Sequence, residues 1–252
     1  MTPRALVLRT AGTNCDGETM HALNLCGASP ELLHLREIAR EPERLFQYSM
    51  MVIPGGFSYG DDVAAGRILA NELKFKLAEQ VRKFVREGRL VSGICNGFQA
   101  LVKAGLLPGN GAFDLVQSAT LTQNDSGRFQ CQWVGMRKER SKAAWLRGFP
   151  KDFELPIAHG EGKFAVKDPK VLNQIEKNGQ VLFRYHPENP NGSAHSIAGI
   201  CNASGNVAGL MPHPERFVTR FQHPAWSRTK PDGVAPGLLF WRAAVEEAGK
   251  IK

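Results

Sequence analysis

A cysteine stands between two glycines in the stretch GICNG, residues 93–97. An apolar run precedes this stretch and a helical pattern follows it, so its spacing predicts a nucleophile elbow, a tight turn that points the thiol out above a sheet. Glycines are needed there because a Cβ would clash with neighbouring backbone. Free N–H groups at the start of the helix favour the thiolate, which is the reactive form. We therefore predict that Cys95 is a nucleophile.

A cysteine nucleophile needs a base, and the base needs a group that orients it. Two histidines are followed two positions later by a glutamate: His213 by Glu215, and His159 by Glu161. Side chains at i and i+2 of extended backbone project to the same side, so either pair could join imidazole and carboxylate. Either histidine could also be a loop residue satisfied by ordinary hydrogen bonds. Prolines flank His213 and restrict its backbone, so we favour His213 and Glu215.

The stretch PGGFSYGDD, residues 54–62, also follows an apolar run. Gly55 and Gly56 would let backbone N–H groups approach a substrate closely. Together with the N–H of Asn96 they could stabilise an oxyanion formed at a carbonyl under attack. A plain turn is the alternative interpretation. No glycine-rich nucleotide-binding fingerprint occurs, so the sequence predicts no nucleotide site.

The other cysteines indicate a reducing compartment. The total of five is odd and no CxxC pair occurs, which makes a disulfide framework improbable. We interpret Cys131 and Cys201 as small buried side chains of the interior. Cys15 receives mostly the same interpretation, although its loop could reach the site.

Alternating strand and helix patterns position these stretches. We predict strands at 5–8, 32–35, 50–53 and 90–94, and helices at 16–25, 71–86 and 96–106. This order implies right-handed crossovers and a mostly parallel sheet, whose sites form beyond the carboxyl ends of the strands. In the second half, short strands separated by turn residues predict antiparallel additions to the same sheet, and a closing helix follows at 235–249.

Composition narrows the functional classes. The chain has 252 residues, 42% of them hydrophobic, which suits a domain with a substantial core. The net charge of +8 is not gathered in one block, and no nucleic-acid-binding module is present, so nucleic-acid binding ranks low. The first apolar run is too short for a signal peptide, and no stretch approaches the ~20 apolar residues of a membrane span. We expect a cytoplasmic protein with no membrane contact.

Taken together, six motifs resemble the class I (triad-type) glutamine amidotransferases. They are PGGFSYGDD, GICNGFQALVKAGLLPG, NDSGRF, AHGEG, NPNGS followed by IAGI, and GNVAGLMPHPERF. Within that class they are most similar to the glutaminase subunits of phosphoribosylformylglycinamidine synthase, an enzyme of de novo purine biosynthesis. The match runs in order from about residue 9 to residue 216. The resemblance implies a flavodoxin-like α/β fold for 1–252, a single amidotransferase domain with a C-terminal extension after about 217.

The resemblance assigns catalytic roles. Cys95 would attack the side-chain amide carbon of glutamine, His213 would move the proton to the leaving ammonia, and Glu215 would orient His213. Backbone N–H groups of Gly56, Phe57 and Asn96 would bind the oxyanion. The weaker candidates for holding the glutamine are Gln99, Asn124, Arg128 and Phe129.

The resemblance also implies partners. The ammonia would pass to a large synthetase subunit that uses ATP and Mg, and a small accessory subunit would complete the complex. This chain itself would need no cofactor and no metal. We expect weak glutaminase activity without the partner. His159 and Glu161 would lie near the partner or the ammonia exit, because the family does not use them as the catalytic pair.

Other interpretations keep the nucleophile elbow but assign a different function to the protein. A glutaminase of another amidotransferase would feed a different synthetase. A DJ-1-like cysteine hydrolase has a related sheet but usually lacks the trailing MPHPE segment. A binding module that lost the chemistry is disfavoured by the presence of Cys95, His213 and Glu215.

Overall fold

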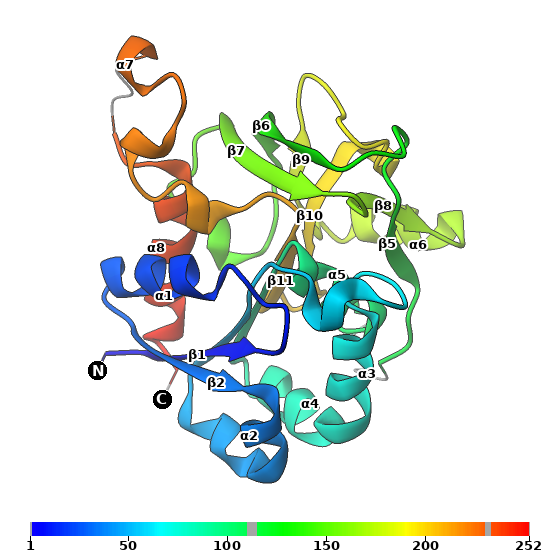
Figure 1. The fold of residues 1–252 in the computed structure, drawn as a ribbon, viewed down its shortest axis with the longest axis vertical. Helices are drawn as coiled ribbons and strands as arrows, with labels where there is room; N and C mark the ends of the chain where they lie inside the picture. Colours follow the sequence, from blue (N-terminus) through cyan, green and yellow to red (C-terminus); the bar gives the residue numbers. More distant parts are fainter. Residues whose placement is uncertain (1, 110–114, 230–232, 252) are drawn as a thin grey trace.

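In the described part of the chain, nine strands form one sheet, and helices pack on both of its faces (Figure 1). The computed structural model describes residues 2–109, 115–229 and 233–251. The strand order is β2-β1-β3-β4-β11-β10-β9-β6-β7. The strands of this sheet are β1 (Arg4–Arg9), β2 (Ser29–His34), β3 (Met50–Ile53), β4 (Leu90–Ile94), β6 (Gln130–Lys138), β7 (Asp152–His159), β9 (Val181–Tyr185), β10 (Ile197–Cys201) and β11 (Val207–Leu210). A second, antiparallel pair consists of β5 (Ala119–Thr122) and β8 (Lys163–Val166).

Five neighbouring strands, β2-β1-β3-β4-β11, run parallel. Every residue of β3, β4 and β11 is buried, as expected for strands covered on both faces. This order is that of a flavodoxin-like sheet. The remaining four strands of the sheet pair antiparallel. The predicted fold class, including the antiparallel additions in the second half, is confirmed.

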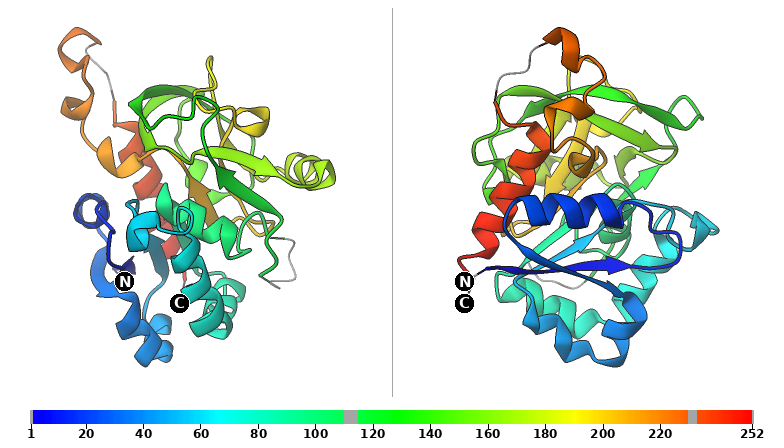
Figure 2. Two further views of the ribbon diagram at one scale, coloured as in Figure 1. Left: turned by 45° about the vertical axis from the view of Figure 1, so that its right-hand side comes forward. Right: turned by 60° about the vertical axis from the view of Figure 1, so that its left-hand side comes forward.

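The helices form two layers. α1 and α8 pack together on one face of the sheet, whereas α3 and α5 pack together on the other (Figure 2). The helices are α1 (Asp16–Leu25), α2 (Leu35–Arg40), α3 (Arg67–Lys76), α4 (Ala78–Arg86), α5 (Asn96–Lys103), α6 (Pro169–Lys177), α7 (Trp226–Thr229) and α8 (Pro236–Ala248).

The single helix predicted over 71–86 is wrong in one respect. Its apolar face is buried as expected, but Leu77 has φ −129° and ψ 14° and separates α3 from α4. The periodicity continues across this break because both helices turn apolar side chains toward the same core. Hydrophobic periodicity alone therefore did not reveal the interruption.

Loops leaving the carboxyl ends of β1 and β3 meet each other. Thr13 and Gly56 form an isolated antiparallel bridge, and the N–H groups of Asn14 and Cys15 both donate to the Gly55 carbonyl. Two of the three predicted site loops are thus joined by backbone hydrogen bonds.

The segment after Phe217 has two different parts. The short helix α7 stands out from the body of the molecule at one end (Figure 1). α8 returns to the body, where Phe240 and Trp241 are fully buried. The closing helix was predicted within one residue at each end.

Candidate active site

Cys95 lies at the sharp turn between β4 and α5. Its φ is 51° and its ψ is −105°, a strained conformation for a residue with a side chain. A Cβ on Gly97 would lie 1.9 Å from the Ile53 carbonyl oxygen, and one on Gly93 would lie 2.7 Å from Gly97 itself. The two glycines are therefore required by close backbone packing, as the elbow pattern predicts.

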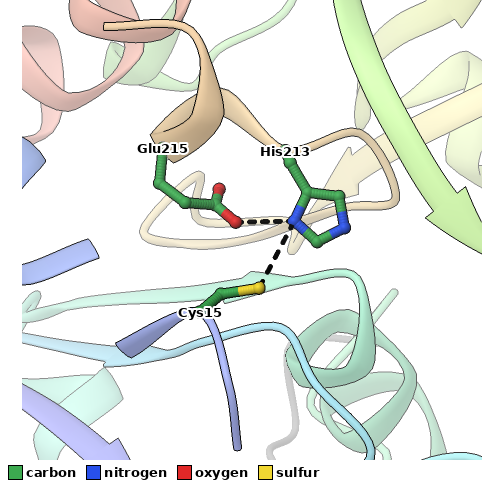
Figure 3. Close-up of side chains that lie close together, drawn as sticks. All are labelled: Cys15, His213 and Glu215. Atoms are coloured by element: carbon green, nitrogen blue, oxygen red, sulfur yellow. Dashed lines mark hydrogen bonds and ion pairs between the residues drawn. The ribbon is translucent and has the colours of Figure 1, made fainter. Parts of the chain in front are cut away.

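His213 follows β11 and is held through its backbone and through one nitrogen of its ring. Its backbone N–H donates to the Pro156 carbonyl at 2.8 Å, and its Nδ1 is 2.6 Å from Oε1 of Glu215 (Figure 3). Both side chains are buried. Glu215 reaches the ring from a 3-10 turn over Pro214–Arg216, not from the extended backbone assumed from the sequence. The pairing was anticipated, but its backbone geometry was not.

Opposing effects set the charge of His213. Burial alone would lower the pKa of this imidazole, but the carboxylate of Glu215 and the thiolate of Cys95 outweigh burial and raise the pKa well above its ordinary value. His213 therefore holds a proton at neutral pH, beside the Cys95 sulfur that lines the same cavity, and an imidazolium in this position favours ionisation of a neighbouring thiol.

A cavity of about 250 Å³ opens above the elbow. It is smaller than the ~300–1,000 Å³ typical of drug-sized ligands, so it suits a small amino acid. It is lined by Asn14, Cys15, Gly56, Phe57, Cys95, Phe129, Ala158, His213 and Arg216. The structure thus brings Cys95 and His213 together with three of the predicted substrate-binding residues.

The predicted oxyanion groups differ in their availability. The N–H of Phe57 donates to the Gly12 carbonyl at 2.9 Å, so in this structure it is occupied by the protein itself. Gly56, whose φ is 150°, packs directly against Gly12 and Thr13. The contributions of the Gly56 and Asn96 N–H groups remain predictions.

Three predicted glutamine-binding residues do not line the cavity. Gln99 accepts from the Asn96 amide at 3.0 Å and donates to the Glu161 carbonyl at 2.7 Å. Asn124 donates to the carbonyls of Arg128 and His159. Both side chains are buried and hold the surrounding loops, while Arg128 is exposed. Phe129 lies at the cavity, with its ring 6.3 Å from that of Phe57.

Cys15, Asn14, Ala158 and Arg216 line the cavity but were not among the predicted site residues. Cys15 Sγ lies 3.8 Å from Nδ1 of His213 and accepts from the Arg216 guanidinium at 3.1 Å. Burial, opposed by the contact with His213, raises the pKa of the Cys15 thiol. Two signals could have found these residues: Cys15 follows the first parallel strand, and Arg216 directly follows Glu215.

A metal ion could in principle be held by Cys15, His213 and Glu215. Their potential ligand atoms all lie within 4.8 Å of one another (Figure 3). However, the Arg216 guanidinium contacts the Cys15 sulfur and would repel a cation. Nδ1 of His213 is already engaged by Glu215. The arrangement fits a catalytic histidine better than a metal centre.

The alternative pair, His159 and Glu161, is not a couple in the structure. His159 Nδ1 is 3.1 Å from Oδ1 of Asn124, whereas the Glu161 carboxylate accepts from the Ala65 N–H and lies 3.6 Å from Lys103 Nζ. The preference for His213 and Glu215 therefore agrees with the geometry.

All five cysteines carry free thiols. Cys201 is buried as predicted, but Cys131 is exposed. It lies in the outer part of β6, where most side chains remain accessible. Its interpretation as an interior cysteine was wrong.

Comparison with protein families shows which family the chain belongs to. The model of the CobB/CobQ-like glutamine amidotransferase domain matches residues 2–246. The chain belongs to this family of glutamine amidotransferases. The match covers both halves of the sheet and all three predicted catalytic residues.

Individual amidotransferases of the family are also similar over nearly the whole chain. The phosphoribosylformylglycinamidine synthase subunit PurQ of Dehalococcoides mccartyi is 44% identical, with 98% of each chain covered. That of Thermus thermophilus is 43% identical, covering 98% of this chain and all of the relative. A solved structure of PurLQS from Thermotoga maritima matches with a TM-score of 0.76 and 33% identity, covering 98% of this chain and 99% of the other.

Among the residues that the structure describes, none of the helices combines the length and the apolar composition that a membrane span requires.

Proposed function

We propose that this amidotransferase hydrolyses glutamine to glutamate and ammonia as the glutaminase subunit of a phosphoribosylformylglycinamidine synthase. The observation that carries the proposal is the shared cavity of Cys95 and His213, with Glu215 bound to the far side of the imidazole. The similarity to PurQ subunits over 98% of the chain supports this member of the family over other amidotransferases and over a DJ-1-like hydrolase.

The reaction follows from the charge state of the site. The Cys95 thiolate attacks the side-chain amide carbon of glutamine, and the tetrahedral oxyanion is met by the N–H groups of Gly56 and Asn96. The C–N bond then breaks, and ammonia leaves with the proton held by His213. Water attacks the resulting thioester, His213 takes a proton from it, and glutamate and the free thiolate are restored.

The partners follow from the same assignment. The relatives are named as subunits of a synthase, and the solved neighbour is an assembly of PurL, PurQ and PurS. We propose that this chain delivers ammonia to a large ATP- and Mg-using synthetase, with a small accessory subunit completing the complex. In this scheme the glutaminase itself uses no cofactor. Free thiols, including the exposed Cys131, suit a cytoplasmic location.

Glutamate release from glutamine tests the proposal. The chain is assayed with its synthetase and accessory subunits, and Cys95→Ala is compared with Cys131→Ala, an exposed thiol outside the cavity. We expect Cys95→Ala to abolish release and Cys131→Ala to leave it unchanged. Release that persists in Cys95→Ala would exclude the proposed nucleophile.

A further inference from the structure

His159 is a buried histidine that the proposed chemistry leaves without a role. Only 3% of its surface is exposed, and its Nδ1 lies 3.1 Å from Oδ1 of Asn124. The same oxygen accepts from the Gly162 N–H, while the amide nitrogen of Asn124 donates to two carbonyls. The Asn124 oxygen is therefore an acceptor, which places the imidazole proton on Nδ1.

The second ring nitrogen of His159, Nε2, consequently presents a lone pair. It is buried, and the part of the chain that the structure describes offers it no hydrogen-bond partner. Burial and, to a lesser extent, the neighbouring His213 lower the pKa of His159 to about 4, so the ring is neutral at physiological pH. Leaving a buried acceptor unmatched is costly. The atom is suited to an N–H or O–H donor that arrives from outside the protein.

β7 places His159 directly behind the nucleophile. The thiol of Cys95 points at the Ala158 carbonyl at 3.6 Å, and Ala158 lines the glutamine cavity. Because successive side chains of a strand face opposite sides, His159 lies on the side of β7 away from that cavity. Its position suits a departing product better than a bound substrate.

Buried polar groups also lie beside the His159 ring. Burial raises the pKa of the Tyr185 phenol, an effect that is opposed by its hydrogen bond with Asn191. Asn191 donates to the Tyr185 hydroxyl at 3.4 Å and to the Gly162 carbonyl at 2.9 Å. A Cβ on Gly162 would lie 2.2 Å from the His159 ring, so the glycine gives the imidazole its space. A run of hydrogen-bonded polar groups thus leads from Tyr185 through Asn191 to Gly162, which lies against the His159 ring.

We propose that Nε2 of His159 receives the ammonia released at Cys95, by accepting a hydrogen bond from it on its way to the synthetase. The proposal rests on the proposed glutaminase function. A neutral imidazole accepts an N–H bond without supplying a proton, so ammonia would remain the uncharged nucleophile that the second reaction needs. A protonated imidazole at this place would instead give up its proton and convert the ammonia to ammonium.

The test measures two products, glutamate and the amidine formed by the synthetase. It uses the complex of this chain with its synthetase and accessory subunits. His159→Asn keeps an amide at the position of Nδ1, and so the contact with Asn124, but leaves the position of Nε2 empty. His159→Gln instead places an amide at the position of Nε2, where its oxygen can accept. His195→Gln alters an exposed histidine and serves as the control.

We expect His159→Asn to release glutamate within about twofold of the wild-type rate while the amidine product per glutamate falls about fivefold, the factor for one lost hydrogen bond. His159→Gln should restore much of the ratio, and His195→Gln should not change it. Synthesis driven by added ammonium chloride should be normal in every variant.

An unchanged product ratio in His159→Asn would overturn the proposal and leave an ordered water as the partner of Nε2. A parallel fall of both products would also overturn it, because it would indicate a structural role. If His159→Asn does not fold, His159→Phe decides, because its ring offers no acceptor at the position of Nε2: a normal product ratio in folded His159→Phe rejects the proposal. Absence of glutamate release from the wild type would refute the proposed function instead.

Discussion

The strained backbone of Cys95 is maintained by the residues around it. Its N–H donates to the Leu210 carbonyl at 2.8 Å, and its thiol contacts the Ala158 carbonyl. Strain of this kind persists only where the surroundings over-determine it, and it concentrates at functional sites. His213 shows the same principle in its electrostatics: a buried cation is tolerated because Glu215 is bound to it.

Replacing Glu215 with Gln should show how much of its effect on His213 comes from the negative charge rather than from orienting the ring. The amide keeps the shape of the side chain but removes the carboxylate that raises the pKa of His213, so burial then lowers this pKa. We expect kcat for glutamate release to fall about 10²-fold or more at neutral pH. Cys15→Ala, which removes the weaker contact to the same Nδ1, should cost less than about tenfold. Equal losses in the two variants would contradict this ranking.

His159 should make the folded state sensitive to mild acid. The unfolded imidazole binds a proton below its ordinary pKa of 6.5, whereas the folded one does so only near pH 4. Stability should therefore fall as the pH drops through this window, by about 2 kcal/mol at about pH 5 from this group. His159→Asn lacks the titration, so urea unfolding at about pH 7.5 and about pH 5 should show a smaller difference in the variant. An equal difference would show that the ring is not desolvated.

At the scale of elements, one face of α5 holds the loop after β3. Asn96, Gln99 and Lys103 lie at i, i+3 and i+7 and face the same side of the helix. The Asn96 amide accepts from the Ser58 N–H and donates to Asp61, both at 3.0 Å. Gln99 and Lys103 bind the turn after β7 through Glu161. The elbow helix thus fixes the loop after β3, which borders the cavity, and the turn after β7.

Gly97→Ala should test whether the elbow requires a residue without Cβ. The new methyl group would lie 1.9 Å from the Ile53 carbonyl oxygen, so β3 and α5 would have to separate. We expect a loss of about 3 kcal/mol in unfolding free energy together with loss of activity. Gly17→Ala, at a helix position with nothing within 4 Å, should be neutral or gain about 0.5 kcal/mol. Similar behaviour of the two variants in urea unfolding would refute the packing argument.

Asp61→Ala should disturb the position of Asn96, whose N–H is expected to bind the oxyanion, without changing the reactivity of the Cys95 thiol. It removes the carboxylate that accepts from Asn96 and from the Gly66 N–H. We expect kcat for glutamate release to fall about tenfold with little change in KM. Alkylation of Cys95 by iodoacetamide, which forms no oxyanion, should keep its rate. Asp62→Ala, the exposed neighbour, is the control. Equal losses in hydrolysis and alkylation would contradict the assignment.

At the scale of the whole molecule, features that depend on local sequence patterns could be predicted, whereas contacts between distant segments could not. The elbow, the His213–Glu215 pair and the parallel strands were predictable because glycine spacing and apolar runs report directly on backbone and burial. The approach of β7 to the nucleophile was not, because nothing local links Ala158 to Cys95. For the same reason Gln99 and Asn124 were assigned to glutamine, although distant backbone groups occupy their amides.

The most direct test of the account is labelling by a glutamine analogue that carries an electrophilic ketone. The chain has five free thiols, so peptide mapping by mass spectrometry can discriminate among them. We predict one adduct per chain, located on Cys95, formed faster when the synthetase and accessory subunits are present, and absent from Cys95→Ala. An adduct on Cys15 or Cys131 instead, or no adduct in a complex that is turning over glutamine, would contradict the claim that Cys95 is the nucleophile.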